Sequence, residues 1–256
     1  MKIKITKKAL AVILSCVLVG TIGNAKINYK MIPEKTRVEK HLTFKRVNKW
    51  YFMSYYFSND DTIKSEIKKI NVKIKNNLYS FYTDNGVFSK KGLDFGTRTL
   101  LESIPDLNGD ILDLGCGYGP IGIYLARYGN VDMVDINKRS MNLAIKNSEL
   151  NNVKVNVFES DGFKNITKKY DYIVTNPPIR VGKNKLYELL FEAKKHLKNN
   201  GIMYLVINKD QGAKSVLKDL NNKYEANVIN KNKGFYIIEA KNSKTDWHIV
   251  VFLIKL

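Results

Sequence analysis

One asparagine followed by two prolines stands where an apolar run ends. Asn176, Pro177 and Pro178 follow residues 172–174. Each proline fixes φ and lacks an N–H, so the carbonyl groups of this turn are expected to stay outside any strand ladder. The Asn176 side-chain oxygen and a neighbouring carbonyl then form a rigid pair of acceptors for a flat –NH2 group. By drawing on its hydrogens, they would localise the nitrogen lone pair and aim it at an electrophile.

A proline pair alone more often ends a strand in a loop, so this chemistry depends on a second motif. Residues 110–122 read DILDLGCGYGPIG, a short strand closed by Asp113 and followed by a glycine-rich loop. Glycines allow positive φ and let backbone N–H groups approach a ligand. The loop glycines recur at every second position: Gly115, Gly117 and Gly119.

The residues after this loop extend the pattern to a nucleoside site. Pro120 suits the first residue of a helix, and the next apolar run, 131–134, ends in Asp135. The Asp135 carboxylate can accept hydrogen bonds from both hydroxyls of a ribose. The order strand, glycine loop, helix, strand and acid therefore predicts a site for a nucleoside.

Asp113 indicates which nucleoside this is. A carboxylate there would repel a pyrophosphate, which disfavours a nicotinamide cofactor although the glycines fit its fingerprint. It would pair with the ammonium group of an amino acid. S-adenosylmethionine is the ligand that carries a ribose at one end and an amino acid at the other. Asp161, which follows residues 153–158, is placed to accept from the adenine amine or is simply a polar strand end.

With these motifs, the chain resembles class I S-adenosylmethionine-dependent methyltransferases that modify exocyclic or amide nitrogens. Residues 86–102, GVFSKKGLDFGTRTLLE, together with DLGCGYGPIG and TNPPI, are similar to the catalytic domain of bacterial small-subunit ribosomal RNA guanine-N2 methyltransferases. The likeness covers roughly residues 53–240.

This resemblance implies a role for each motif. The Asn-Pro-Pro turn would hold the target amine, and the loop from Asp113 to Gly119 with Asp135 would hold the cofactor. Phe88, Asp94 and Thr97 would line the substrate pocket. The chain departs from many amino-methyltransferases at Ile179, where they carry an aromatic residue that stacks on the base. Ile179 and Arg180 are expected to contact the substrate, although a solvated loop explains Arg180 equally well.

The remaining pattern predicts a doubly wound α/β fold: a mostly parallel seven-stranded sheet with an antiparallel C-terminal strand. A hairpin is expected at residues 71–81, before the core. The other expected elements are helices at 95–104, 141–150, 184–198 and 211–223, strands at 153–158 and 203–207, and a final antiparallel pair at 235–240 and 249–254.

Composition indicates a polyanionic partner and no metal. The net charge of +19 favours ribosomal RNA or the small ribosomal subunit, although a generally lysine-rich proteome would also produce it. Cys16 and Cys116 lie in unrelated contexts, which excludes a disulfide framework or a thiolate metal site. The three histidines are also scattered, so no metal ligand set is predicted.

Residues 1–52 have no counterpart in the resemblance. They carry a basic start, an apolar run at 9–23 and a small-residue pattern typical of a secretory signal peptide. Cytoplasmic cofactor and RNA conflict with export, so we interpret 1–52 as an upstream extension of a methyltransferase domain at 53–256. The alternatives are a membrane anchor through residues 9–23, with the enzyme facing the cytoplasm, and true export.

The leading hypothesis is a cytoplasmic methyltransferase acting on guanine N2 of 16S ribosomal RNA. Methylation of a protein glutamine is a second reading, because the same acceptors suit a carboxamide. A non-catalytic RNA-binding or ribosome-assembly factor is a third, but Asp113, Gly115 and Asn176 are all intact.

Overall fold

The computed structural model describes residues 64–178 and 182–243 of the chain. The extension at 1–52, its boundary at residue 53 and the strand expected at 249–254 lie outside these ranges. The described residues form the following elements: β1 (Lys68–Ile74), β2 (Asn77–Thr83), α3 (Phe95–Ser103), β3 (Asp110–Leu114), α4 (Pro120–Leu125), β4 (Asn130–Asp135), α5 (Lys138–Leu150), β5 (Asn156–Glu159), β6 (Tyr170–Thr175), α6 (Lys183–His196), β7 (Leu197–Asn208), the 3-10 turn η4 (Lys209–Gln211), α7 (Ala213–Leu220), β8 (Glu225–Asn232) and β9 (Phe235–Lys241).

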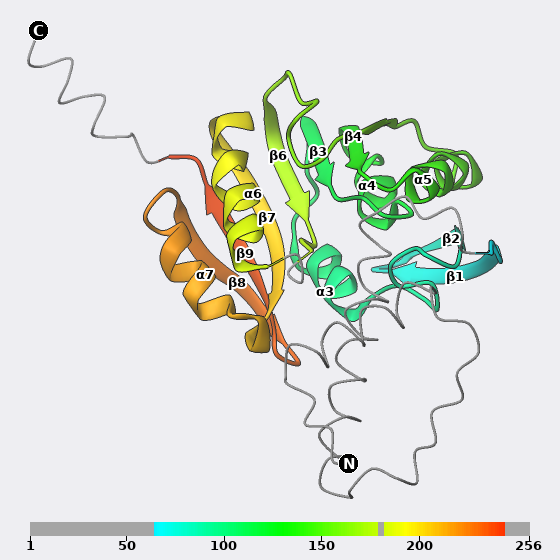
Figure 1. The fold of residues 1–256 in the computed structure, drawn as a ribbon, viewed down its shortest axis with the longest axis horizontal. Coiled ribbons are helices and arrows are strands. Elements are labelled where there is room, and N and C mark those ends of the chain that lie inside the picture. Colours follow the sequence, from blue (N-terminus) through cyan, green and yellow to red (C-terminus); the bar gives the residue numbers. More distant parts are fainter. Residues whose placement is uncertain (1–63, 179–181, 244–256) are drawn as a thin grey trace, which may run out of the picture. The chain divides into compact units, whose positions relative to one another are not determined.

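A seven-stranded sheet organises these elements, in the order β5-β4-β3-β6-β7-β9-β8 (Figure 1). Neighbouring strands from β5 to β7 are parallel, whereas β9 is antiparallel to both β7 and β8. This confirms the predicted doubly wound fold with an antiparallel C-terminal strand. The hairpin β1–β2 forms a separate two-stranded sheet, and its turn at Lys75 has a φ of 48°.

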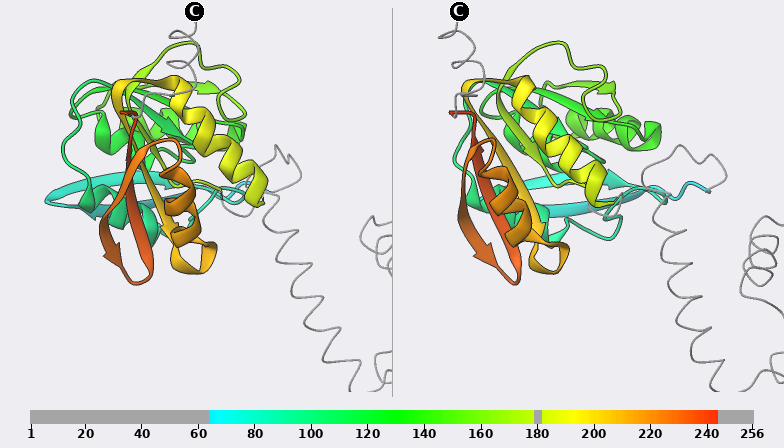
Figure 2. Two further views of the ribbon diagram at one scale, coloured as in Figure 1. Left: turned by 90° about the vertical axis from the view of Figure 1, so that its left-hand side faces the viewer. Right: turned by 60° about the vertical axis from the view of Figure 1, so that its left-hand side comes forward.

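Each face of the sheet has its own hydrophobic core. On one face, residues of α3, α4, α5 and the hairpin pack together, among them the fully buried Leu100, Phe81 and Ile123. On the other face, α6 and α7 lie together over the sheet (Figure 2) and contribute Leu190 and Leu220. Side chains that alternate between the two clusters along β3, such as Ile111 and Leu112, show why this strand is apolar throughout.

One strand assignment from the sequence needs correction, and one strand of the structure was not predicted. The strand expected at 153–158 is β5, Asn156–Glu159, because Val153 and Val155 pack against the core before the ladder with β4 begins. The partner expected for β9 at 249–254 lies outside the described residues and stays a prediction. Among the described residues, β9 pairs antiparallel with β7 and with β8, and the sequence pattern did not indicate β8. Its burial pattern is mostly exposed, so this edge strand lacks an apolar signature.

Candidate active site

The glycine loop and the Asn-Pro-Pro turn come together at the carboxyl edge of the sheet. The loop follows β3, Asp135 ends β4, and Asn176 follows β6. Because β4, β3 and β6 are adjacent and parallel, their carboxyl ends meet at one edge. The buried Thr175 hydroxyl donates to the Leu114 carbonyl at 2.8 Å, which joins the residue before Asn176 to the residue before the loop.

A hydrogen-bond network fixes the orientation of the Asn176 amide. Its Nδ2 donates to Oδ2 of Asp94 at 3.2 Å and to Oγ1 of Thr97 at 2.9 Å. An ionised carboxylate only accepts, so the –NH2 side of Asn176 must face Asp94. Both amide hydrogens are used in this way. No residue in the described ranges donates to the Asn176 Oδ1. The Asn176 side-chain oxygen is therefore left as an acceptor on the other side of the amide.

Asp94 also begins the helix that carries Thr97. Its Oδ2 accepts from the Thr97 backbone N–H at 3.0 Å, so Asp94 is the N-cap of α3. Leu100 and Leu101 bury one face of α3, and Gly96 packs so closely that an added Cβ would lie 2.9 Å from the Phe235 ring. These contacts fix α3, and through it the groups that hold Asn176.

The loop glycines serve two different purposes. Gly115 and Gly117 have φ values of 76° and 56°, and a Cβ at either position would meet no atom within 4 Å. Their conformation and this open space suit a loop that approaches a ligand. Gly119 differs, because a Cβ there would lie 2.8 Å from the Met133 side chain, and its φ of 96° marks the N-cap of α4. Gly119 thus packs against the core rather than facing the open side of the loop.

Asp113 lies beneath the loop and has an unusual environment for a carboxyl group. It is fully buried, and its Oδ2 accepts from the Gly122 N–H at 2.8 Å. Oδ1 is buried too and has no hydrogen-bond partner among the described residues. Burial, with a smaller contribution from the nearby Asp135 charge, raises the Asp113 pKa to about 8. An unpaired buried carboxyl oxygen fits a site for a cationic group such as an ammonium.

Asp135 links the loop to the end of β4. One carboxylate oxygen accepts from the Gly117 N–H at 2.8 Å, and the other accepts from the Asn137 N–H at 2.9 Å. Burial raises the Asp135 pKa, while these two donors act in the opposite direction. Asp135 therefore holds the loop in place, and its position beside Gly117 is compatible with the ribose contact expected from the sequence.

The other predicted site residues differ in their exposure and contacts. Asp161 forms ion pairs with Lys164 and, at 3.2 Å, with Lys185, and the Lys164 hydrogen bond is the largest cause that lowers its pKa. Phe88 is 47% exposed on the segment between β2 and α3. Pro177 is buried and Pro178 half-buried. Ile179 and Arg180 lie outside the described residues.

Neither cysteine nor histidine chemistry emerges in the described part of the chain. Cys116 is buried, and burial raises its thiol pKa well above the usual value, so it is no activated nucleophile. His196 stacks on Phe163, with ring centroids 4.6 Å apart. Residues 64–178 and 182–243 contain no group of three or more metal-ligating side chains. No helix within these ranges is both long and apolar enough to span a bilayer.

Two asparagines that the sequence did not single out join the hairpin to the glycine loop. The fully buried Asn147 of α5 accepts from the Tyr82 N–H and donates to the carbonyls of Tyr82 and Tyr118, at 2.6, 2.9 and 2.8 Å. One turn later, Asn151 exchanges two hydrogen bonds with the Ser80 backbone. These amides pair with β2 as a neighbouring strand would. In the sequence, the only sign of this shared role was the spacing of the two asparagines, four residues apart on one helix face.

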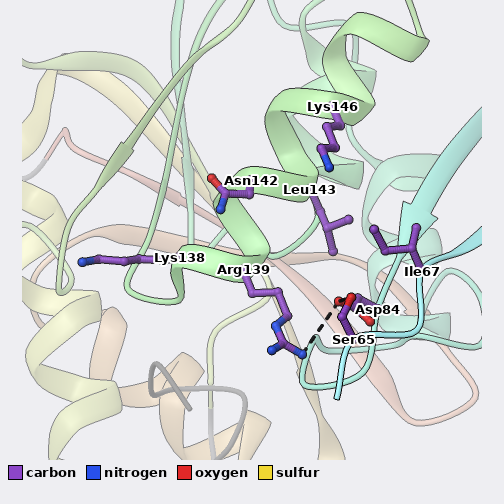
Figure 3. Close-up of a pocket in the computed structure, with 8 residues that line it drawn as sticks. All are labelled: Ser65, Ile67, Asp84, Lys138, Arg139, Asn142, Leu143 and Lys146. Atoms are coloured by element: carbon purple, nitrogen blue, oxygen red, sulfur yellow. Dashed lines mark hydrogen bonds and ion pairs between the residues drawn. The ribbon is translucent and has the colours of Figure 1, made fainter. Parts of the chain in front are cut away.

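A surface hollow of about 270 Å³ lies over the start of α5 (Figure 3). It contains an ion pair between Arg139 and Asp84 at 3.7 Å. None of the site residues predicted from the sequence lines it. The residues that line the hollow are Ser65, Ile67, Asp84, Lys138, Arg139, Asn142, Leu143 and Lys146.

Comparison with known families agrees with this geometry. A family model described as the methyltransferase small domain matches residues 78–239, which include the loop, the Asn-Pro-Pro turn and Asp94. The chain belongs to this family. Membership in the methyltransferase small domain family confirms the resemblance to class I methyltransferases, whose cofactor is S-adenosylmethionine.

Individual relatives include two kinds of protein. The uncharacterized protein YbxB of Bacillus subtilis is 40% identical over 196 residues, which cover 73% of this chain and 98% of YbxB. Ribosomal RNA small subunit methyltransferase C of Vibrio parahaemolyticus is 34% identical over 165 residues, which cover 62% of this chain and 48% of that enzyme.

A solved structure shows the same similarity. It is the 16S rRNA N2 guanine methyltransferase RsmC of T. thermophilus in complex with AdoMet and guanosine, with a TM-score of 0.64 and 27% identity. The match covers 70% of this chain and 51% of that one. This member of the methyltransferase small domain family therefore spans about half the length of the RsmC proteins and nearly all of YbxB.

Proposed function

We propose that this chain methylates the exocyclic N2 amine of a guanine in 16S ribosomal RNA, with S-adenosylmethionine as the methyl donor. The observation that carries the proposal is the Asn176 amide, oriented by Asp94 and Thr97 so that Oδ1 serves as an acceptor. It lies at the same edge of the sheet as the glycine loop. Such a substrate places the enzyme in the cytoplasm, where ribosomal RNA is found.

Residues of the loop provide the cofactor site in this proposal. Asp113 Oδ1 pairs with the cofactor ammonium, Asp135 binds the ribose hydroxyls, and Gly115 and Gly117 let the backbone approach. The orphaned Asp113 oxygen and the open space at the two glycines support this assignment. Bound S-adenosylmethionine supplies an electrophilic methyl group.

Residues of the turn prepare the amine. Asn176 Oδ1 and the Pro177 carbonyl accept its two hydrogens, which localises the nitrogen lone pair and turns it away from the acceptors. The new N–CH3 bond would replace the S–CH3 bond of the cofactor, which would leave as S-adenosylhomocysteine, and the methylated nitrogen would release one proton to solvent. The catalytic effect comes from positioning, and neither a strong base nor a covalent enzyme intermediate is needed. The target base has to leave its stack to reach the turn.

Similarity to RsmC supports guanine N2 over other amines, because that enzyme was solved with AdoMet and guanosine and shares 27% identity with this chain. The test is transfer of label from S-adenosylmethionine to 16S RNA or small subunits isolated from cells that lack the enzyme. Nucleoside analysis should then find N2-methylguanosine. Label only in protein, on a glutamine amide, would refute the RNA proposal and leave the methyltransferase chemistry intact.

A further inference from the structure

The tip of the β8–β9 hairpin lies at the same edge of the sheet as Asn176. The first residue of β9, Phe235, pairs with Asn208 at the end of β7, and β7 runs parallel to β6. The hairpin tip is therefore beside the carboxyl ends of the parallel strands, on the side of the sheet where α3 lies (Figure 1). The target amine would be held at this edge.

The tip is rigidly built. Lys233 and Gly234 have φ values of 45° and 84°, the paired positive values of a tight two-residue hairpin turn. The Lys209 N–H, just after β7, donates to the Gly234 carbonyl at 2.7 Å. A rigid tip can hold a partner at a fixed distance from the site.

Aromatic packing connects the tip to the Asn176 network. The Phe235 and Phe95 rings have centroids 5.6 Å apart. Phe95 directly follows Asp94, which binds the Asn176 amide. The tip therefore contacts Phe95, the neighbour in sequence of the aspartate that orients the Asn176 amide.

Around the tip, exposed lysines lie close to half-buried aromatic rings. Lys209, Lys231 and Lys233 are all exposed, and none forms an ion pair with another residue in the described ranges. The Lys231 ammonium lies 4.9 Å from the centre of the Tyr236 ring, and that of Lys233 lies 5.2 Å from the Phe95 ring. Lysines next to aromatic faces are typical of surfaces that bind nucleic-acid strands.

We propose that this lysine tip, defined as Lys209, Lys231 and Lys233, binds the phosphodiester backbone of the RNA beside the target nucleotide. This inference rests on the proposed function and adds to it the surface that holds the substrate. The tip raises RNA affinity without taking part in methyl transfer.

The test uses the full chain with Lys231→Glu and Lys233→Glu combined. A matched control combines Lys154→Glu and Lys169→Glu, which change the charge equally. Lys154 and Lys169 are exposed and precede β5 and β6, at the opposite edge of the sheet. Binding of 16S RNA is measured at a series of KCl concentrations, methyl transfer gives kcat and KM for RNA, and calorimetry gives cofactor affinity.

For the tip variant we expect RNA affinity to fall at least ~10-fold and the slope of log K against log salt to shrink by about 1.5, because two phosphate contacts are lost. KM should rise, while kcat and cofactor affinity stay at the wild-type value. The control should bind RNA within about twofold of wild type.

Three results would overturn the inference alone: equal RNA binding by the tip variant and the control, a fall in kcat at unchanged KM, or a loss of cofactor affinity in the tip variant. If wild-type protein transfers no methyl group to RNA, the proposed function fails and this inference fails with it.

Discussion

The amide nitrogen of Asn176 donates to Oδ2 of Asp94 at 3.2 Å, across 82 positions of the chain. The same Asp94 oxygen caps the first turn of α3. A single carboxylate oxygen therefore both begins a helix and determines which side of the Asn176 amide faces the proposed substrate. The orientation of the acceptor depends on correct packing of α3.

Removal of the Asn176 side chain should abolish catalysis and spare cofactor binding. We expect Asn176→Ala to lower kcat by ~100-fold or more, as loss of an oriented polar group in an active site does. Calorimetry with S-adenosylmethionine should give the wild-type affinity, because the loop follows a different strand. Full activity of this variant would eliminate the proposed role of the turn.

Thr97 should act as a positioning residue. Thr97→Val keeps the shape but removes the hydroxyl that accepts the second Asn176 hydrogen, so kcat is expected to fall about 10-fold. Thr97→Ser, which keeps the hydroxyl, should restore most of the activity. Equal losses in both variants would point to packing rather than orientation of the amide.

Asp113 should make stability and cofactor binding depend on pH. Its pKa is raised from 3.8 to about 8, so the folded protein keeps a proton that the unfolded chain releases. The contribution of this carboxyl to the free energy of unfolding is full below the unfolded pKa and is lost as pH rises toward 8. Cofactor affinity should rise over the same window, because an ammonium pairs with the ionised form.

The matched variant is Asp113→Asn, which can still accept from the Gly122 N–H. It should remove this part of the pH dependence of unfolding and bind S-adenosylmethionine at least about 10-fold more weakly. Denaturant unfolding at several pH values, together with calorimetry, measures both effects. An unchanged pH profile would show that Asp113 does not titrate in this range.

Gly115 and Gly119 should respond differently to alanine. Gly115→Ala meets no neighbouring atom and costs only the strain of positive φ, roughly 1 kcal/mol, so its main effect should be weaker cofactor binding. Gly119→Ala adds a clash with Met133 and should lower the unfolding midpoint further. Chemical denaturation and cofactor titration of both variants test this. Equal stability of the two would contradict the packing role of Gly119.

Asn147 should be important for stability although it is remote from the proposed chemistry. Asn147→Ala leaves the N–H and carbonyl of Tyr82 and the carbonyl of Tyr118 without their partner, at a cost of about 2–4 kcal/mol. Asn142→Ala, at an exposed position of the same helix, serves as the control and should change stability by less than ~0.5 kcal/mol. Thermal unfolding of the two variants compares them directly.

Local patterns were sufficient where neighbours along the chain set the structure. The hairpin β1–β2, the helix α3 and the start of α4 at Pro120 lie where the sequence predicted them. Local patterns were not sufficient where a strand depends on its partner. The exposed edge strand β8 was missed, because its residues alternate only weakly and its ladder with β9 defines it.

The sequence by itself determined the reaction class. Residue type and spacing in the loop and the Asn-Pro-Pro turn specify acceptors, glycine conformations and an acid, all of which follow from a few consecutive residues. Tertiary structure alone decided that Asp94 and Thr97 orient Asn176, that Gly119 packs against Met133, and that Asn147 ties the hairpin to the loop. These contacts join residues far apart in the chain, and their geometry depends on how the layers pack, which no local pattern encodes.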